Sequence, residues 1–234
     1  LDLRSNPLQD WPDFSSAYSL LILKIDVDDI LKPLPKNIGF PEKNHLHTLN
    51  IRYIAVDQIA DFIAKLNHLY ALYLPQYSHS TFPNITTMGP NLKVLGFYHP
   101  LSMTKFPTDH VVDKSKTSHS GITELNLSPA IEEVDEDFWN LFPNLTRLTI
   151  KDSSRFKHLP SFVNWKKTLV SLKLENVPNI QVSNKLAELS LTKLELRQLN
   201  LQNFSVSSEL VGKLSTLILS ENKLSYFPDV RSVI

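Results

Sequence analysis

The chain has 234 residues and a hydrophobic content of 42%, which is enough for a buried core and well above the level of disordered chains. Lysine plus arginine and aspartate plus glutamate number 24 each, so the formal charge is zero and the composition argues against nucleic acid or an anionic membrane as the main partner. The chain contains no cysteine, which excludes disulfides, thiolate metal sites and a cysteine nucleophile.

A short phrase recurs along the whole chain and is the main structural signal. It has the form Leu-x-x-Leu-x-Leu, often followed by a polar residue and a further apolar one, and this spacing fits neither a regular helix nor a long strand. From the second copy onward the steps between copies range from 22 to 30 residues. In chain order the copies begin at Leu1, Leu20, Leu46, Leu69, Leu92, Ile122, Leu145, Leu169, Leu191 and Leu214.

Each copy predicts one short strand followed by a turn and a return segment, because alternate side chains of a strand point to the same side. A single copy cannot bury its apolar side, so neighbouring copies must stack into one parallel sheet. Two segments with acidic starts and helical apolar spacing predict short outer helices at residues 57–66 and 135–142. A polar insertion at residues 107–121 predicts an exposed loop or, alternatively, a flap that contacts a partner.

The spacing resembles the leucine-rich repeat family, whose consensus is Leu-x-x-Leu-x-Leu-x-x-Asn-x-Leu with a period of about 20 to 29 residues. The resemblance covers essentially the whole chain. It implies an α/β fold, a curved leucine-rich repeat solenoid of about ten repeats. A parallel sheet would line its concave face, and short helices, 3₁₀ turns or extended turns its convex face. We expect one domain over residues 1–234 without recognisable caps, and therefore a fragment of a longer protein.

The consensus asparagine occurs only at Asn6 and Asn222. In the family this side chain hydrogen-bonds the backbone of the loop after the strand. The middle repeats carry other residues at this position, so we expect their loop backbones to find other partners, in protein or in water.

The resemblance implies binding through the concave face, where neighbouring strands lie about 4.8 Å apart and their equivalent positions form lateral rows. In the middle repeats these rows bring tyrosines together around the small Gly96, and exposed aromatic side chains on a rigid sheet are typical of binding hot spots. The alternative is that the rings only pack on each other or on a loop. The predicted ligand-binding residues, charged neighbours included, are Arg52, Tyr53, Tyr73, Tyr98, His99, Lys151, Lys173 and Arg197.

Charge alternates along two parts of the rows. One interpretation is cross-strand ion pairs that satisfy each other, each worth less than about 1 kcal/mol. The other is a charged surface that recognises a partner. The two parts are Arg4, Asp26 and Arg52, and Lys151, Glu175 and Arg197 beside Lys173 and Glu195.

Catalytic and metal-binding motifs do not appear in the sequence. His45 and His47 form a His-x-His pair without a third ligand nearby, so we interpret them as surface histidines. A phosphate-binding loop and a nucleophile-elbow serine are also missing. We therefore expect no enzymatic activity, no metal and no cofactor. N-glycosylation sequons begin at Asn84, Asn126, Asn144 and Asn203.

The expected function is a non-catalytic module that binds a protein or peptide ligand, as part of a receptor-like or adhesion-type glycoprotein in signalling or innate immunity. The expected location is the cell surface or the extracellular space. The alternative is an intracellular sensor or scaffold in the cytoplasm, similar to immune receptors with irregular repeats. No apolar run reaches the about 18 residues that span a bilayer, and the first residues lack signal-peptide features. Membrane attachment would therefore come from a missing segment, and the oligomeric state is left open.

Overall fold

A computed structural model describes the chain from residue 1 to residue 226 with several gaps. Of the predicted elements, the helix at 57–66 and the insertion at 107–121 lie almost entirely outside the described part. The described residues are 1–6, 8, 11–26, 39–52, 63, 66–74, 91–98, 121–128, 133–182, 184–205 and 207–226.

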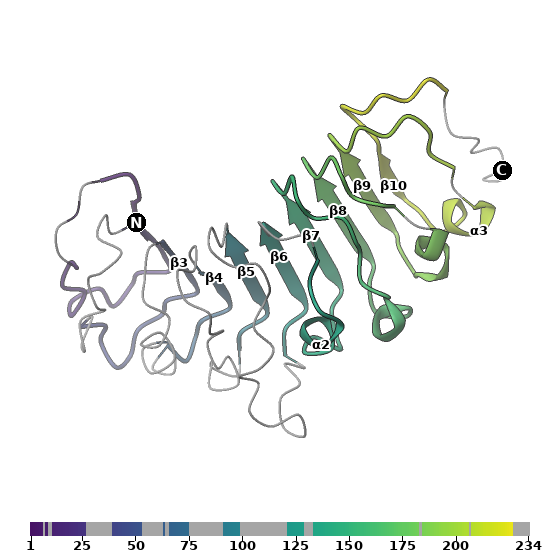
Figure 1. Ribbon diagram of the computed structural model, residues 1–234. Helices are drawn as coiled ribbons and strands as arrows, with labels where there is room; N and C mark the ends of the chain where they lie inside the picture. Colours follow the sequence, from purple (N-terminus) through teal and green to yellow (C-terminus); the bar gives the residue numbers. More distant parts are fainter. Residues whose placement is uncertain are drawn as a thin grey trace.

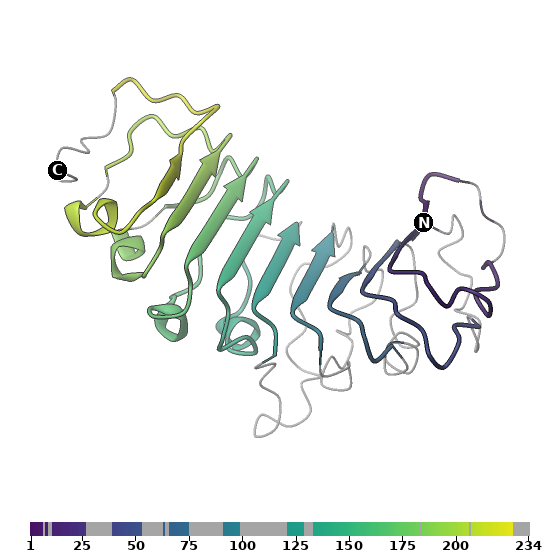
Figure 2. The ribbon, with the colours of Figure 1, turned by 180° about the vertical axis from the view of Figure 1, so that it is seen from behind.

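The described strands form one parallel sheet in which each strand lies beside the next one in the sequence (Figures 1 and 2). The chain therefore returns to the same edge of the sheet after every strand, as stacked repeats require. This confirms the predicted parallel-sheet solenoid. The strands are β1 (Asp2–Leu3), β2 (Ile22–Asp26), β3 (Thr48–Arg52), β4 (Ala71–Leu74), β5 (Val94–Tyr98), β6 (Glu124–Ser128), β7 (Arg147–Lys151), β8 (Ser171–Glu175), β9 (Lys193–Arg197) and β10 (Thr216–Ile218).

The register between neighbouring strands is one-to-one. Leu125 pairs with Leu148, and Leu148 pairs with Leu172, and all three side chains are fully buried. The residues between these leucines face outward, because successive strand side chains point to opposite sides. The same register aligns outward residues into the rows that the sequence predicts. One complete row reads Asp2, Lys24, Asn50, Tyr73, Gly96, Asn126, Thr149, Lys173, Glu195 and Ile218.

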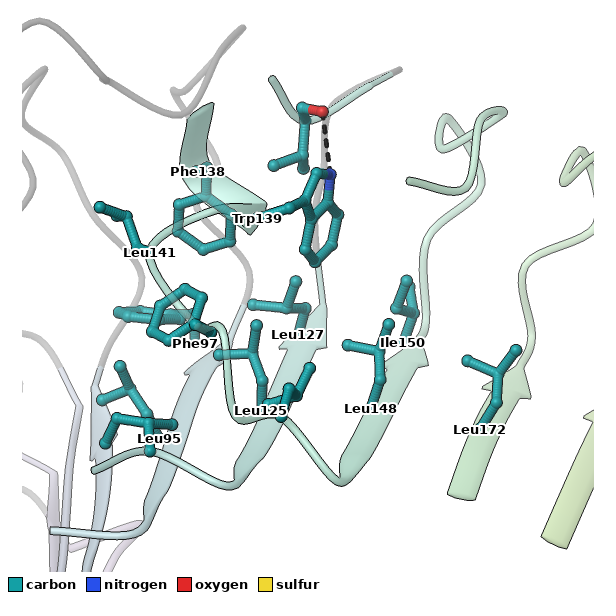
Figure 3. Close-up of a cluster of buried hydrophobic side chains, with 14 of the residues drawn as sticks. Leu95, Phe97, Leu125, Leu127, Phe138, Trp139, Leu141, Leu148, Ile150 and Leu172 are labelled. Atoms are coloured by element: carbon teal, nitrogen blue, oxygen red, sulfur yellow. Dashed lines mark hydrogen bonds between the residues drawn. The ribbon is translucent and has the colours of Figure 1, made fainter. Parts of the chain in front are cut away.

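The core is one continuous cluster that extends from Phe14 to Leu210. Aromatic rings link its successive repeats. Phe138 meets Phe97 of β5 edge-on, with 6.5 Å between ring centroids, and Figure 3 shows both rings beside the inward leucines of β5 to β8. Such edge-to-face pairs add about 0.5–1.5 kcal/mol each beyond the burial of their area.

The helical segments are short and lie in the return segments between strands. In Figure 1, α2 and α3 lie below the strands to which they connect. The first of them, α2, falls inside residues 135–142, where the sequence predicts a helix, and its first turn is acidic, as favours a helix N-terminus. The segments are α2 (Glu136–Trp139), the 3₁₀ helices η3 (Val163–Trp165) and η4 (Asn184–Glu188), and α3 (Ser208–Val211).

Among the described residues, the turns after the strands are closed in two ways. Where the consensus asparagine is present, its side chain bonds the backbone: Asn222 donates from Nδ2 to the Leu196 oxygen at 2.7 Å and accepts at Oδ1 from the Leu199 amide at 2.9 Å. Where another residue replaces it, adjacent turns pair through their backbones, and the Ser153 amide donates to the Asn176 oxygen at 3.1 Å. The turn at Ser153 lacks the consensus asparagine, and its backbone bonds instead to the backbone of the next repeat.

Candidate recognition surface

The outward side chains of the strands form what we call the open face of the sheet, and their character changes along the array. The aromatic region is formed by the outward residues of β3 to β5, and the charged region by those of β6 to β9. Beneath both regions lie the inward leucines of one continuous core. The aromatic region contains Thr48, Asn50, Ala71, Tyr73, Val94 and Gly96, with Arg52 and Tyr98 at the strand ends. The charged region contains Glu124, Asn126, Ser128, Arg147, Thr149, Lys151, Ser171, Lys173, Glu175, Lys193, Glu195 and Arg197.

The ring of Tyr73 lies across Gly96 of the neighbouring strand. The two residues pair in the register of β4 and β5. A Cβ atom added to Gly96 would collide with Cδ1 of the Tyr73 ring and come within 2.9 Å of its Cε1. Because Gly96 has no side chain, the Tyr73 ring can lie directly on its backbone. Glycines in strands often occur where another group approaches this closely.

The Tyr73 hydroxyl stays protonated at neutral pH. Burial raises its pKa above the ordinary value of 10.0, and the nearby Glu124 carboxylate raises the pKa further. Glu124 in turn accepts hydrogen bonds from Asn126 Nδ2 at 3.1 Å and from Arg147 Nε at 2.8 Å. The charge of Glu124, in the first ion pair of the charged region, therefore acts on Tyr73 of the aromatic region.

The remaining members of the predicted aromatic cluster are placed only in part. Tyr98 ends β5 and pairs in register with Ser128, and Arg52 ends β3, while the side chains of Tyr98 and Arg52 lie outside the described part. Tyr53 and His99 are also outside the described residues. Whether these residues gather around Gly96 with Tyr73 stays a prediction.

Two further ring pairs lie just before the strands of the aromatic region, and the sequence reasoning missed them. His47 stacks on Tyr70, with ring centroids 4.8 Å apart and planes 13° from parallel, and His45 lies 5.4 Å from His68. Each partner holds the equivalent position one repeat later, so the repeat alignment itself was the signal. The described residues contain no group of three or more histidine, aspartate or glutamate side chains that could hold a metal ion.

Two polar atoms on the open face are buried without a partner. Asn50 Oδ1 and Ser128 Oγ have no hydrogen-bond partner among the described residues. Asn50 lies beside Tyr73 in the row, and Ser128 lies beside Tyr98. Unpaired buried polar atoms are uncommon in folded proteins; Asn50 lies within the aromatic region and Ser128 on the strand next to it.

On β8 and β9 the ion pairs run along the strands, whereas Arg147 of β7 pairs across the strands with Glu124 of β6. Lys173 Nζ lies 2.7 Å from Glu175 Oε2 in β8, while Lys193 Nζ and Arg197 Nε lie 2.7 Å and 3.2 Å from the two carboxylate oxygens of Glu195 in β9. One interpretation of the sequence placed these residues in cross-strand ion pairs, whereas these contacts join residues of the same strand. The reason is that residues two apart share one face of a strand, and β9 places a cation on each side of Glu195.

Glu195 is a nearly buried carboxylate that remains ionised at neutral pH. The hydrogen bond from Lys193 lowers its pKa below 4.5 against the opposing effect of burial, and the charges of Lys193 and Lys173 and the hydrogen bond from Arg197 lower it further. Lys151 lies half-buried at the end of β7, and the register places it beside Glu175. The sequence-predicted residues Lys151, Lys173 and Arg197 therefore lie on three adjacent strands of one surface.

The first charged part of the rows also pairs locally. Arg4 forms a bidentate pair with Asp2, at 2.9 Å from Nε to Oδ1 and 2.7 Å from Nη2 to Oδ2, and Lys24 lies 3.8 Å from Asp2 across the strands. The hydrogen bond from Arg4 holds the pKa of Asp2 well below its usual range. The side chains of Asp26 and Arg52 lie outside the described residues, so the alternation predicted there stays untested.

The residues that follow β7, β8, β9 and β10 form an exposed polar ladder, which the sequence reasoning also missed. They adopt positive φ angles of 52° to 60°, a region that asparagine and aspartate tolerate better than most residues. Asn176 Nδ2 donates to Asp152 Oδ1 at 3.1 Å, and Gln198 Nε2 donates to a Glu221 carboxylate oxygen. The polar residues that directly follow β7, β8 and β9, Asp152, Asn176 and Gln198, were the available signal.

The sequon asparagines differ in location. Asn144 and Asn203 are exposed and lie outside the strands, whereas Asn126 lies on the open face. Asn84 lies outside the described residues, as does nearly all of the insertion at 107–121. Within the described residues, every helix is too short or too polar to cross a bilayer.

Known proteins resemble this chain in structure and not in sequence. No family model and no curated protein matches the chain by sequence. Its structure is similar to that of the leucine-rich repeat protein LIC12759 of Leptospira interrogans, with a TM-score of 0.62 and 21% sequence identity over 98% of this chain. It is also similar to the leucine-rich repeat domain of the type III effector XopL, with a TM-score of 0.54 and 18% identity over the whole chain.

This chain spans 62% of the LIC12759 chain and 72% of the XopL chain. At these levels of sequence identity the likeness concerns the fold, a solenoid of parallel strands.

Proposed function

We propose that this chain, which folds as a leucine-rich repeat solenoid, is a non-catalytic module that recognises a protein or peptide ligand through the open face of its sheet. The observation that carries the proposal is the row register. Ten parallel strands hold outward side chains of varied chemistry at fixed places on one continuous core. A surface that is ordered before binding loses little conformational entropy on binding. We infer one repeat for each strand, with the open face on the concave side and the short helices opposite.

Tyr73 is the proposed centre of the binding surface. Its ring is held flat on Gly96, so it offers a large, ordered, amphipathic area, and tyrosine is enriched among residues that dominate binding energy. The charged residues of β7 to β9 extend the surface on one side. The full proposed set is Arg52, Tyr53, Tyr73, Tyr98, His99, Lys151, Lys173 and Arg197.

The proposed context is the ligand-binding part of a receptor-like or adhesion-type protein at the cell surface. The exposed sequons at Asn144 and Asn203 are compatible with glycosylation there, because both lie away from the open face. The second candidate is an intracellular sensor or scaffold, which the likeness to a domain of a type III effector favours. Material from the natural source separates the two. A mass decrease after glycosidase treatment supports the first candidate, and an unmodified mass supports the second.

Site-specific photocrosslinking tests the binding surface. A photoreactive amino acid replaces Thr149 on the open face in one variant and Lys167, which is exposed beyond η3, in a matched control. Both variants are irradiated in extract from the natural source, and adducts are identified by mass spectrometry. We expect one defined protein adduct at position 149 and not at position 167. Adducts at 167 alone, or none at 149, would contradict the proposal.

Once a partner is identified, alanine variants test the proposed centre. Tyr73→Ala, alone and with Tyr98→Ala, should weaken binding by about 30-fold or more, the effect of losing a hot spot of about 2 kcal/mol. Tyr226→Ala is the control, because this tyrosine is 82% exposed and lies beyond the last strand. Unchanged affinity in the Tyr73→Ala/Tyr98→Ala double variant would remove Tyr73 and Tyr98 from the proposed site.

A further inference from the structure

The charged region carries more cations than carboxylates, although the whole chain is balanced. On β6 to β9 five basic side chains accompany three acidic ones, while the complete sequence has 24 of each. The excess is therefore a local property of one part of the open face. The basic residues are Arg147, Lys151, Lys173, Lys193 and Arg197, and the acidic residues are Glu124, Glu175 and Glu195.

The cations also extend further into solvent than most of the carboxylates that neutralise them. In the pair between β7 and β6, the Arg147 side chain is 50% exposed and that of Glu124 is 25% exposed. In β9, Lys193 is 47% exposed beside Glu195, which is 8% exposed. Only Lys173 and Glu175 are equally exposed, at 33% and 35%. A molecule that approaches the charged region therefore meets mainly ammonium and guanidinium groups.

The buried carboxylate explains how these cations are held without being neutralised at the surface. Glu195 binds Lys193 and Arg197 through its two oxygens, and it lies between the strands of Lys173 and Ile218 in the row. A carboxylate beneath a layer of cations orders their side chains. Ordering before binding lowers the entropy that a ligand must overcome.

We propose that the charged region binds an acidic segment of a protein partner, laid over β7 to β9. The proposal rests on the proposed recognition function and adds the chemistry of its ligand. Aspartate and glutamate side chains of the partner would bind the outer faces of the five cations, and arginine would bind them in a bidentate manner. The surface would at the same time reject basic segments, because like charges placed together cost binding energy.

Two labelled peptides test the proposal directly on the intact chain. One is a fluorescein-labelled peptide of repeated Glu-Gly-Ser units, and the other is the matched Gln-Gly-Ser peptide, which is neutral. Binding is measured by fluorescence anisotropy at about 10 mM and about 150 mM NaCl, where the Debye length is about 30 Å and about 8 Å. We expect the glutamate peptide to bind at least about tenfold more tightly than the glutamine peptide at low salt, and to lose most of this advantage at high salt.

Substitutions then locate the binding. Lys151→Gln/Lys173→Gln removes two cations without leaving a buried carboxylate unpaired, because Glu195 keeps Lys193 and Arg197. The matched control is Lys166→Gln/Lys167→Gln, which removes the same charge from exposed positions beyond η3. We expect roughly tenfold weaker binding of the glutamate peptide by the first variant, since each exposed ion pair contributes up to about fivefold. The control should bind as the unchanged chain does, and Lys151→Arg/Lys173→Arg should retain binding.

Several results would overturn the proposal. Equal affinity for the two peptides at low salt would show that carboxylates are not recognised. Equal losses in the two lysine-to-glutamine variants would show that the effect comes from total charge. Sedimentation that shows salt-sensitive self-association, abolished by Lys151→Gln/Lys173→Gln, would assign the charged region to a second copy of this chain, whose acidic residues Glu133, Asp135, Glu136 and Asp137 would be the occupant. Flotation with phosphatidylserine vesicles, with the same loss in that variant, would assign it to an anionic membrane.

The outcomes also distinguish this proposal from the recognition function. If photocrosslinking at position 149 yields a partner while the glutamate peptide shows no preference, only the acidic chemistry is wrong. If the peptide binds as expected but no partner crosslinks at position 149, the charged region recognises carboxylates outside the proposed function.

Discussion

The aromatic and charged regions share one core and one register, yet they complete their open face by different means. In the aromatic region a tyrosine ring covers a glycine of the next strand, and outward Ala71 and Val94 are buried. In the charged region, ion pairs run along β8 and β9 and leave basic groups outermost. The inward leucines therefore determine the strand positions and register, while the outward positions are free to vary. One array can in this way carry two kinds of surface.

The largest expected effect tests whether the two regions are one folding unit. Leu95→Ala in the aromatic region and Leu172→Ala in the charged region each remove a completely buried side chain, and each should lower the free energy of unfolding by about 2–5 kcal/mol. Because the core is continuous, both variants should still unfold in one transition. Urea denaturation followed by circular dichroism measures this. A second transition in only one variant would show that the regions unfold independently.

A smaller effect is expected for the glycine that supports the tyrosine. Gly96→Ala forces the Tyr73 ring off the sheet and should cost about 1–3 kcal/mol of stability, the usual cost of overpacking. The loss should largely disappear when Tyr73→Ala is added, because the colliding ring is then removed. Asn126→Ala, in the same row on the next strand, is the control and should cost less than about 1 kcal/mol. Additive losses in the double variant would contradict the proposed contact.

Acid should affect the charged region through Glu195. Because its folded-state pKa lies below 4.5, its ionised form stabilises the fold above about pH 4.5, and this contribution is lost as pH falls through the folded-state pKa. Glu195→Gln should therefore cost about 1–2 kcal/mol at pH 7 and flatten the loss of stability in acid. Glu175→Gln, at a more exposed pair, should cost less than about 1 kcal/mol. Thermal unfolding at several pH values measures both.

The smallest expected effect is on the ionisation of Tyr73, in the aromatic region, at alkaline pH. The pKa of Tyr73 is raised above 10.0, so the contribution of its protonated form to stability is present below pH 10 and is lost as pH rises through the folded-state pKa. In a titration followed by tyrosinate absorbance, Tyr73→Phe should remove one late-titrating group. Glu124→Gln should move that group to lower pH. A titration unchanged by both substitutions would contradict the environment described for Tyr73.

The backbone could be predicted from the sequence because its cause is local and repeated. Leu148 and Leu172 recur at the same place in each phrase, and burial of that position dictates both strand and register. The row from Asp2 to Ile218 follows from the same alignment. The alignment also places His47 and Tyr70 at equivalent positions of neighbouring repeats, where their rings stack.

The pairing of charges could not be predicted in this way. Lys173 has acidic neighbours both along its own strand, at Glu175, and across the sheet, at Glu195. Strand spacing alone does not decide between them, because long side chains reach either partner and the energies differ by a fraction of a kcal/mol. The flat contact of Tyr73 on Gly96 could not be predicted from the sequence either. A glycine beside a tyrosine allows the contact, and only the rotamer of the ring determines that it forms.

The one-to-one register has a geometric consequence for any ligand that crosses the strands. Successive residues of one row lie about 4.8 Å apart, the spacing of neighbouring strands, whereas an extended peptide repeats its same-side residues about every 6.6 Å. Such a peptide falls out of phase after two strands. An α-helix advances about 5.4 Å per turn, so one residue of each turn stays close to its counterpart over three or four strands. The spacing of the strands therefore matches the pitch of a helix laid across the sheet better than the repeat of an extended peptide.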